Sequence, residues 1–294
     1  MKKNLLFIAL FLFACAFTVQ AKTALVIIAH GAPSAKWNAP VLDLEKKLNL
    51  NPIPGISYTR VALMEFSEPH INTVINDCEK QGIDTVFALP LFIAPSSHSE
   101  EDIPNILGLK YNPNTRKSLK EEGAKLVNTK IHIILGPTLS YGDIIYQTVL
   151  QPIKKMSVNP SDEAVLILAH GDPEYIGFWN ELLKGSEDYV KKNTSINYTD
   201  AKLVAMGVDL SKEITPLLQK AAAKKKRILV QGIYLSSNVY DMAKMSGMLE
   251  NQSGLSKSHP SEKVLYSQSA MLPECSDAIC QWIVRVTQGW LQNK

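Results

Sequence analysis

Two histidines and a glutamate stand just beyond apolar runs of the kind that form buried strands. His30 and His98 each follow such a run, and Glu65 follows a third. In open α/β sheets, ligands bind at the carboxyl ends of the strands, so we expect the three side chains to share one opening. Imidazole suits Co, Fe, Ni and Zn, and a carboxylate completes such a site or accepts protons. The sequence therefore predicts a metal site of His30, His98 and Glu65 with open coordination positions.

Further polar residues stand near the same strand ends. Ser96 and Ser97 precede His98 in a polar segment, which favours a functional loop over a structural one. His170 follows another apolar run, and we expect it to line a substrate cleft together with Ser96 and Ser97. For His30 a purely structural role, with the ring hydrogen-bonded to backbone, stays open at this point.

The elements that would position these residues alternate between strands and helices. Apolar and β-branched runs predict buried strands, and residues with helical spacing lie between them. Strands are expected at 23–29, 58–63, 85–94, 131–135, 164–169 and 228–235, and helices at 37–48, 71–80 and 141–155. Met64–Pro69 is expected to begin the helix at 71–80, and Glu100–Asp102 to open another. This alternation indicates an α/β protein with parallel sheets.

The second part of the chain repeats the first. A strand ends at His170-Gly171 as another ends at His30-Gly31, residues 204–206 echo residues 61–63, and Asn238 stands where His98 would recur. Several matches in the same order indicate a duplication. We predict two similar halves, residues 22–155 and 156–294, whose parallel sheets face a central cleft.

Residues 1–21 read as an export signal. Lys2 and Lys3 precede the apolar stretch 5–17, and Val19-Gln20-Ala21 suits cleavage. We expect export, to the periplasm, with cleavage before Lys22. An uncleaved anchor, or lipidation at Cys15, is the alternative, and membrane association is expected only through such an N-terminus.

Composition narrows the classes of function. With 294 residues and 46% hydrophobic residues, the chain can bury a large core. The net charge of +3 includes two lysines of the signal, so the exported chain is nearly neutral, which argues against nucleic acid as a partner. Cys275 and Cys280 could bridge only if Cys275 lies off the helix expected there. A homo-oligomer stays open.

The segment 90–104, PLFIAPSSHSEEDIP, together with Ala29-His30-Gly31 and 65–69 (EFSEP), resembles the class II tetrapyrrole chelatases, in particular the CbiX/CbiK-type sirohydrochlorin cobaltochelatases. The resemblance implies two flavodoxin-like halves around a cleft and insertion of a divalent metal into a tetrapyrrole without ATP. It also implies that His30 and His98 bind the metal, with Glu65 as their acidic partner. Co²⁺ is the expected substrate metal, with Fe²⁺ or Ni²⁺ as alternatives.

The sequence departs from this family in two respects. Residues 94–97 (APSS) replace the glycine-containing loop expected before the histidine, and Asn238 leaves the second half without an equivalent of His98. Export is also unusual for enzymes of cobalamin or sirohaem synthesis. An exported protein that binds a tetrapyrrole or metal for transport or scavenging is therefore a second hypothesis. A histidine phosphatase is a third, although Ala29 stands where such an enzyme needs arginine.

Overall fold

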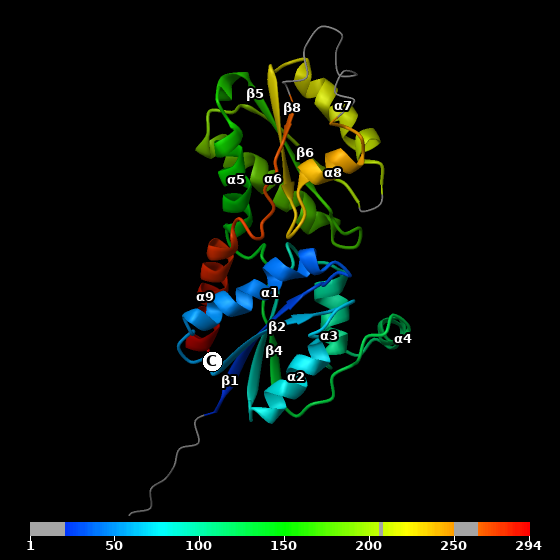
Figure 1. Cartoon of the computed structure of the whole chain (residues 1–294), viewed down its shortest axis with the longest axis vertical. Helices are drawn as coiled ribbons and strands as arrows, with labels where there is room; N and C mark the ends of the chain where they lie inside the picture. Colours follow the sequence, from blue (N-terminus) through cyan, green and yellow to red (C-terminus); the bar gives the residue numbers. More distant parts are fainter. Residues whose placement is uncertain (1–20, 206–207, 250–263) are drawn as a thin grey trace, which may run out of the picture.

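The chain forms two four-stranded parallel sheets with helices on their faces, as the computed structural model in Figure 1 shows. The structure describes residues 21–205, 208–249 and 264–294, so the expected signal, apart from Ala21, lies outside the described residues. The strand order is β2-β1-β3-β4 in the first sheet and β6-β5-β7-β8 in the second. The strands are β1 (Thr23–Ala29), β2 (Tyr58–Leu63), β3 (Thr85–Pro90), β4 (His132–Leu135), β5 (Glu163–Ala169), β6 (Tyr198–Leu203), β7 (Arg227–Ile233) and β8 (Val264–Tyr266). The predicted α/β class with two similar halves is confirmed.

The central strands are buried almost throughout because both of their faces are covered. All seven residues of β1 are buried, and successive side chains enter two different cores, since side chains of a strand alternate between the faces of its sheet. Leu25 and Ile27 join one cluster, whereas Val26 and Ile28 join another. The same alternation holds in β5, where Val165 and Leu166 lie in different cores.

The helices divide between the two faces of each sheet. They are α1 (Ala35–Leu50), α2 (Ile71–Lys80), α3 (Ile103–Ile106), α4 (Pro113–Glu121), α5 (Ile144–Met156), α6 (Ile176–Asn193), α7 (Leu210–Ala222), α8 (Val239–Met245) and α9 (Ser276–Gln292). Helices α2, α3 and α4 contribute to the core on one face of the first sheet, and α7 and α8 to the corresponding core of the second. The other four long helices, α1, α5, α6 and α9, share a core that runs through both halves.

The terminal helix of each half packs on the other half. Helix α5 follows β4 in the chain, yet it contacts α6 and β7, whereas α9 contacts α1 (Figure 1). Trp290 of α9 stacks on Phe87 of β3 with ring centroids 4.5 Å apart, and the Trp282 indole donates to the Tyr141 carbonyl at 2.7 Å. This exchange makes the two sheets parts of one packed body. The division of the chain at residues 155 and 156 stays a prediction.

Two local predictions were wrong. Strand β3 ends at Pro90 rather than residue 94; the apolar run continues because Leu91 and Ala94 remain buried, and burial rather than strand pairing is what an apolar run reports. Residues 64–69 are not helical, and Leu63 N–H donates to the Pro69 carbonyl instead.

The internal alignment of the two halves also needs correction. Leu63 pairs with Ala29, and Leu203 pairs with Ala169, so Leu203 is the counterpart of Leu63. The apparent echo of residues 61–63 in residues 204–206 is therefore displaced by three positions. Short apolar triplets recur too easily to fix a register by themselves.

Two general properties concern the described part of the chain. None of its helices is both long and apolar enough to cross a bilayer. Its cysteines, Cys78, Cys275 and Cys280, are free, so no Cys275–Cys280 bridge is formed. Cys275 is the residue that precedes α9, and burial raises the pKa of both Cys275 and Cys280.

Candidate metal site

The structure brings His30, Glu65 and His98 together. One ligand atom from each lies within 4.8 Å of the others, and the two imidazole rings meet edge to face with centroids 4.8 Å apart. All three residues are partly exposed. In the part of the chain that the structure describes, this is the one group of three histidine, cysteine, aspartate or glutamate side chains close enough to share an ion.

Backbone contacts hold His30 and Glu65 side by side. The Glu65 N–H donates to the His30 carbonyl at 2.9 Å, which ties the turn after β1 to the turn after β2. Gly31 has φ +87°, and a Cβ there would lie 2.4 Å from the Glu65 carbonyl oxygen. Only glycine allows both this backbone conformation and this close approach.

Both imidazoles have Nδ1 in a hydrogen bond and leave Nε2 free. His30 Nδ1 lies 2.8 Å from the Gly31 carbonyl oxygen, and His98 Nδ1 lies 2.7 Å from Asp102 Oδ2. A carbonyl can only accept a hydrogen bond, and so can an ionised carboxylate, so in both rings Nδ1 carries the proton. The Nε2 lone pairs are then free for a metal, in the arrangement in which metal-binding histidines are usually oriented.

Asp102 reaches His98 because both lie on one helical turn. His98–Asp102 forms a single wide π-helical turn that leads into α3, so residues four apart are neighbours. The hydrogen bond that His98 donates to Asp102 raises the pKa of His98, burial opposes this, and the charges of Asp102, Glu65 and Asp172 add to it. Sequence reasoning assigned Asp102 to a helix start; its spacing from His98 was the available signal.

Phe66 extends beside the three residues. It has φ 63°, a left-handed conformation that costs a non-glycine residue about 1 to 3 kcal/mol. Its side chain is 59% exposed, and its ring centroid lies 5.9 Å from that of His30. A strained backbone that displays an apolar ring beside polar ligands is typical of a binding site, and the sequence pattern gave no signal for it.

The two serines before His98 build the loop that carries it. Ser96 is 7% exposed and shares hydrogen bonds with Ser99. Ser97 donates through its N–H and its Oγ to Asp172 of the second half. Burial alone would raise the pKa of Asp172, but these bonds and two backbone N–H groups hold it below its ordinary value. Substrate contacts of Ser96 and Ser97 stay a prediction.

The second half keeps the scaffold of the site without its ligands. His170 is exposed, and its Nδ1 contacts the Gly171 carbonyl as His30 contacts that of Gly31. Ala205, two residues after Leu203, takes the place of Glu65. Asn238 is the residue before α8, where its side chain caps the helix by accepting a hydrogen bond from the Asp241 N–H at 2.8 Å. His170 therefore faces no equivalent of Glu65 or His98, and its role at the substrate stays a prediction.

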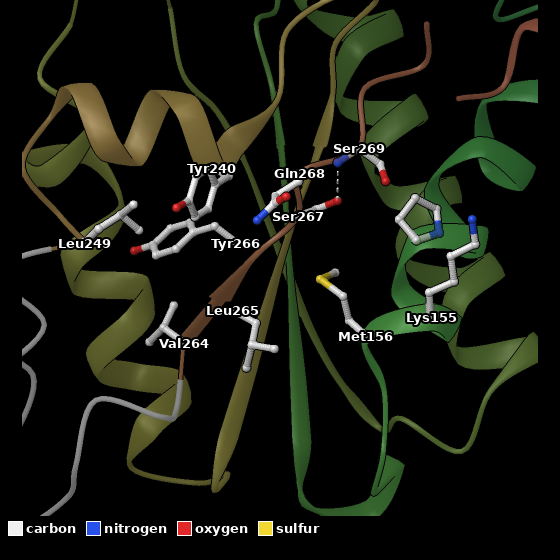
Figure 2. A pocket seen from close by; sticks show the side chains of 11 residues that line it. Lys155, Met156, Tyr240, Leu249, Val264, Leu265, Tyr266, Ser267, Gln268 and Ser269 are labelled. Atoms are coloured by element: carbon white, nitrogen blue, oxygen red, sulfur yellow. Dashed lines mark hydrogen bonds between the residues drawn. The ribbon is translucent and has the colours of Figure 1, made fainter. Parts of the chain in front are cut away.

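Two cavities differ in their relation to this site. One of about 220 Å³ adjoins it and is lined by Glu65, Phe66 and His70, among others. Figure 2 shows another, of about 510 Å³, along edge strand β8. Tyr240 and Tyr266 line its one side and Lys155 its other. The cavity beside β8 contains none of the residues predicted to bind metal or substrate.

Comparison with known proteins finds a family-model match within the first half. Residues 24–155 match the family model CbiX. A sirohydrochlorin cobaltochelatase of Methanococcus maripaludis is 36% identical over 86 residues, which are 29% of this chain and 58% of that protein. The chain thus spans less than two thirds of the length of this relative.

Solved structures match over both halves. SirB from Bacillus subtilis with Fe³⁺ superposes with a TM-score of 0.64 and 16% identity, covering 88% of this chain and 93% of that one. The sirohydrochlorin chelatase SirB of B. subtilis subspecies spizizenii in complex with cobalt gives a TM-score of 0.61 and 15% identity, covering 91% and 94%. At this identity the likeness concerns the fold. The resemblance to CbiX/CbiK-type chelatases that the sequence predicts is confirmed by the family match.

Replacing Asp102 by asparagine tests its effect on His98. An amide removes the charge that favours imidazolium, so in Asp102→Asn the pKa of His98 falls from its raised value toward 6.5. Because an asparagine fixes the ring tautomer less firmly, Co²⁺ affinity at pH 8 falls by about 10- to 100-fold. NMR titration of the His98 ring and a Co²⁺ binding isotherm measure the two effects.

The matched control for this substitution is Glu101→Gln, which makes the same charge change on the same turn. Glu101 pairs with Lys110 and is not among the groups that shift the pKa of His98. If Asp102→Asn leaves both the pKa of His98 and the Co²⁺ affinity as they are in Glu101→Gln, Asp102 does not orient the ring.

Proposed function

We propose that this protein is a chelatase that inserts Co²⁺ or Fe²⁺ into sirohydrochlorin or a related tetrapyrrole, without ATP. The observation that carries the proposal is the cluster of His30, Glu65 and His98, whose ligand atoms lie within 4.8 Å of one another. The CbiX match of residues 24–155 supports the same reaction, as do relatives named sirohydrochlorin cobaltochelatase.

The cluster suits a metal that must be passed on. Three protein side chains leave coordination positions open, as they do in catalytic rather than structural metal sites. Their partial exposure lets hydrated ions enter and lets a macrocycle approach. Cobalt and iron both prefer imidazole nitrogen with a carboxylate oxygen, so the ligand set fits the metals in the SirB structures. Ni²⁺ is a further candidate substrate on the same chemical ground.

Insertion releases two protons, since a neutral pyrrole pair gives up its N–H protons as the divalent ion binds four ring nitrogens. Glu65 is placed to accept one proton beside the metal. Once the ion has left, His98 can accept another, because Asp102 favours its protonated form. The exposed ring of Phe66 offers a flat apolar surface on which the macrocycle can stack. His170 lies on the facing half, where we propose that it contacts the periphery of the ring.

An anaerobic assay with metal and sirohydrochlorin tests the proposal. The full chain should change the absorbance of the macrocycle faster than the uncatalysed reaction does, with multiple turnovers. His98→Ala should lower this rate by at least about 100-fold, because the metal site then lacks one of its protein ligands. His132→Ala is the control, since His132 is exposed at the start of β4.

A rate equal to the uncatalysed one with Co²⁺, Fe²⁺ and Ni²⁺ alike would exclude the chelatase reaction. Tight binding of one equivalent of macrocycle without turnover would instead favour the second candidate, an exported protein that carries a tetrapyrrole or a metal. The apolar segment after Lys2 and Lys3 motivates that candidate.

We further propose that the protein is exported, on the strength of residues 1–21 alone. N-terminal sequencing of the protein recovered from its native cells should begin at Lys22. A sequence that begins at Cys15, with attached lipid, would favour the lipidated alternative, and one that begins at residue 1 or 2 would contradict cleavage.

A further inference from the structure

The loop that carries His98 is longer than its counterpart in the second half. Phe92 and Tyr234 are equivalent, since Pro90 pairs with Ile28 in the first sheet as Gly232 pairs with Leu168 in the second, and Phe92 and Tyr234 each lie two positions further on. The first helical residue after the loop, His98, comes six positions after Phe92, whereas the first residue of α8, Val239, comes five positions after Tyr234. The loop before His98 therefore contains one additional residue.

The longer loop is hydrogen-bonded to the second half at two points. Asp172 Oδ2 accepts from the Ser97 N–H at 3.0 Å and from Ser97 Oγ at 2.6 Å. The Trp179 indole N–H donates to the Pro95 carbonyl at 3.1 Å. Both partners are held firmly, because Asp172 Oδ1 accepts the Glu174 N–H at 2.9 Å, and Trp179 is 5% exposed in the core shared by the two halves.

Among the described residues, the corresponding loop of the second half, residues 234–238, makes no such hydrogen bonds to the first half. The first half carries Ala32 where the second carries Asp172, each directly after a His-Gly pair. The N–H and carbonyl of Ala32 are occupied by the side chain of Asn38, at 2.9 and 2.8 Å. Of the two loops, only the one that carries His98 is thus hydrogen-bonded to the opposite half.

We propose that Asp172 and Trp179 are positioning residues that hold the His98 loop in place, so that the second half completes the metal site of the first. The proposal rests on His98 acting as a metal ligand in the proposed function. It assigns the second half, which lacks ligands at Ala205 and Asn238, a role in building the site: two anchors next to His98 keep its ring 4.8 Å from that of His30.

Four variants of the full chain separate hydrogen bonding from charge. Asp172→Asn has one acceptor oxygen and cannot serve both Ser97 and the Glu174 amide. Ser97→Ala removes one bond and keeps the charge of Asp172, and Trp179→Phe removes the bond to Pro95 and keeps an aromatic ring in the core. Asp188→Asn is the control for charge, because Asp188 pairs with Lys184 on the exposed side of α6.

The first readout needs no metal. The centroid of the His98 ring lies 6.0 Å from that of the Phe92 ring, and His98 meets the His30 ring edge to face. The ring currents of these neighbours make the NMR resonances of His98 sensitive to its position. We expect these resonances to move in Asp172→Asn, Ser97→Ala and Trp179→Phe, and to stay in place in Asp188→Asn, while thermal unfolding shows that every variant is folded.

The second readout is Co²⁺ affinity in the absence of tetrapyrrole. We expect a loss of about tenfold in Asp172→Asn and in Ser97→Ala, which disturb hydrogen bonds to a charged carboxylate, and about threefold in Trp179→Phe, which removes a hydrogen bond to a neutral carbonyl. Unchanged His98 resonances in all three variants would overturn the proposal. So would an effect confined to Asp172→Asn, which would mark a charge effect rather than positioning.

A failure of the proposed function can be distinguished from a failure of this proposal. If the unmodified chain binds no Co²⁺, the metal site is excluded, yet displaced His98 resonances in Ser97→Ala and Trp179→Phe would still establish that the second half positions this loop.

Discussion

The contact between two imidazole rings, with centroids 4.8 Å apart, is the arrangement that the rest of the structure maintains. It exists because β1 and β3 are neighbours in a parallel sheet, so that the residues beyond their carboxyl ends emerge side by side. Neither strand fixes the rings by itself. Gly31 lets the turn after β1 approach Glu65, and Asp102 fixes the tautomer of His98. The fold brings the three side chains close together, and local hydrogen bonds orient them.

The two halves share a scaffold, but they differ in the side chains that stand at the ends of their strands. Both have a strand that ends in His-Gly with the same contact from Nδ1, yet the second half has Ala205 and Asn238 where the first has Glu65 and His98. Exchange of the terminal helices α5 and α9 gives the halves one continuous core, so the second half is fixed firmly enough to support loops of the first. Such a division of roles follows naturally from duplication, since only one copy of a site has to be kept.

The sequence predicted the scaffold better than the detail of the site. The predicted bounds of β1 and β2 coincide with those of the structure, because both strands are rich in apolar and β-branched residues, the types that strands favour. Periodicity could not place the end of β3 or reveal the non-helical turn at residues 64–69, where the hydrogen bond from the Leu63 N–H to the Pro69 carbonyl takes the place of helical bonds.

The residues missed by sequence reasoning act through tertiary contacts. His30, Glu65 and His98 were found because strand ends and residue types suffice to suggest a ligand, and the structure brings them together although their roles stay predictions. Asp172 and Trp179 lie more than 70 positions from the loop they contact, and no local pattern links residues so far apart. Phe66 was missed because its exposure depends on a left-handed φ that phenylalanine rarely adopts.

X-ray absorption at the cobalt edge of the Co²⁺-loaded full chain tests the central claim most directly. If His30 and His98 hold one ion, the spectrum should require two imidazole ligands with oxygen in the remaining positions, and one imidazole should disappear in His30→Ala and likewise in His98→Ala. A spectrum fitted by oxygen ligands alone, or an imidazole count unchanged in both variants, would contradict a metal site at the edge of the first sheet.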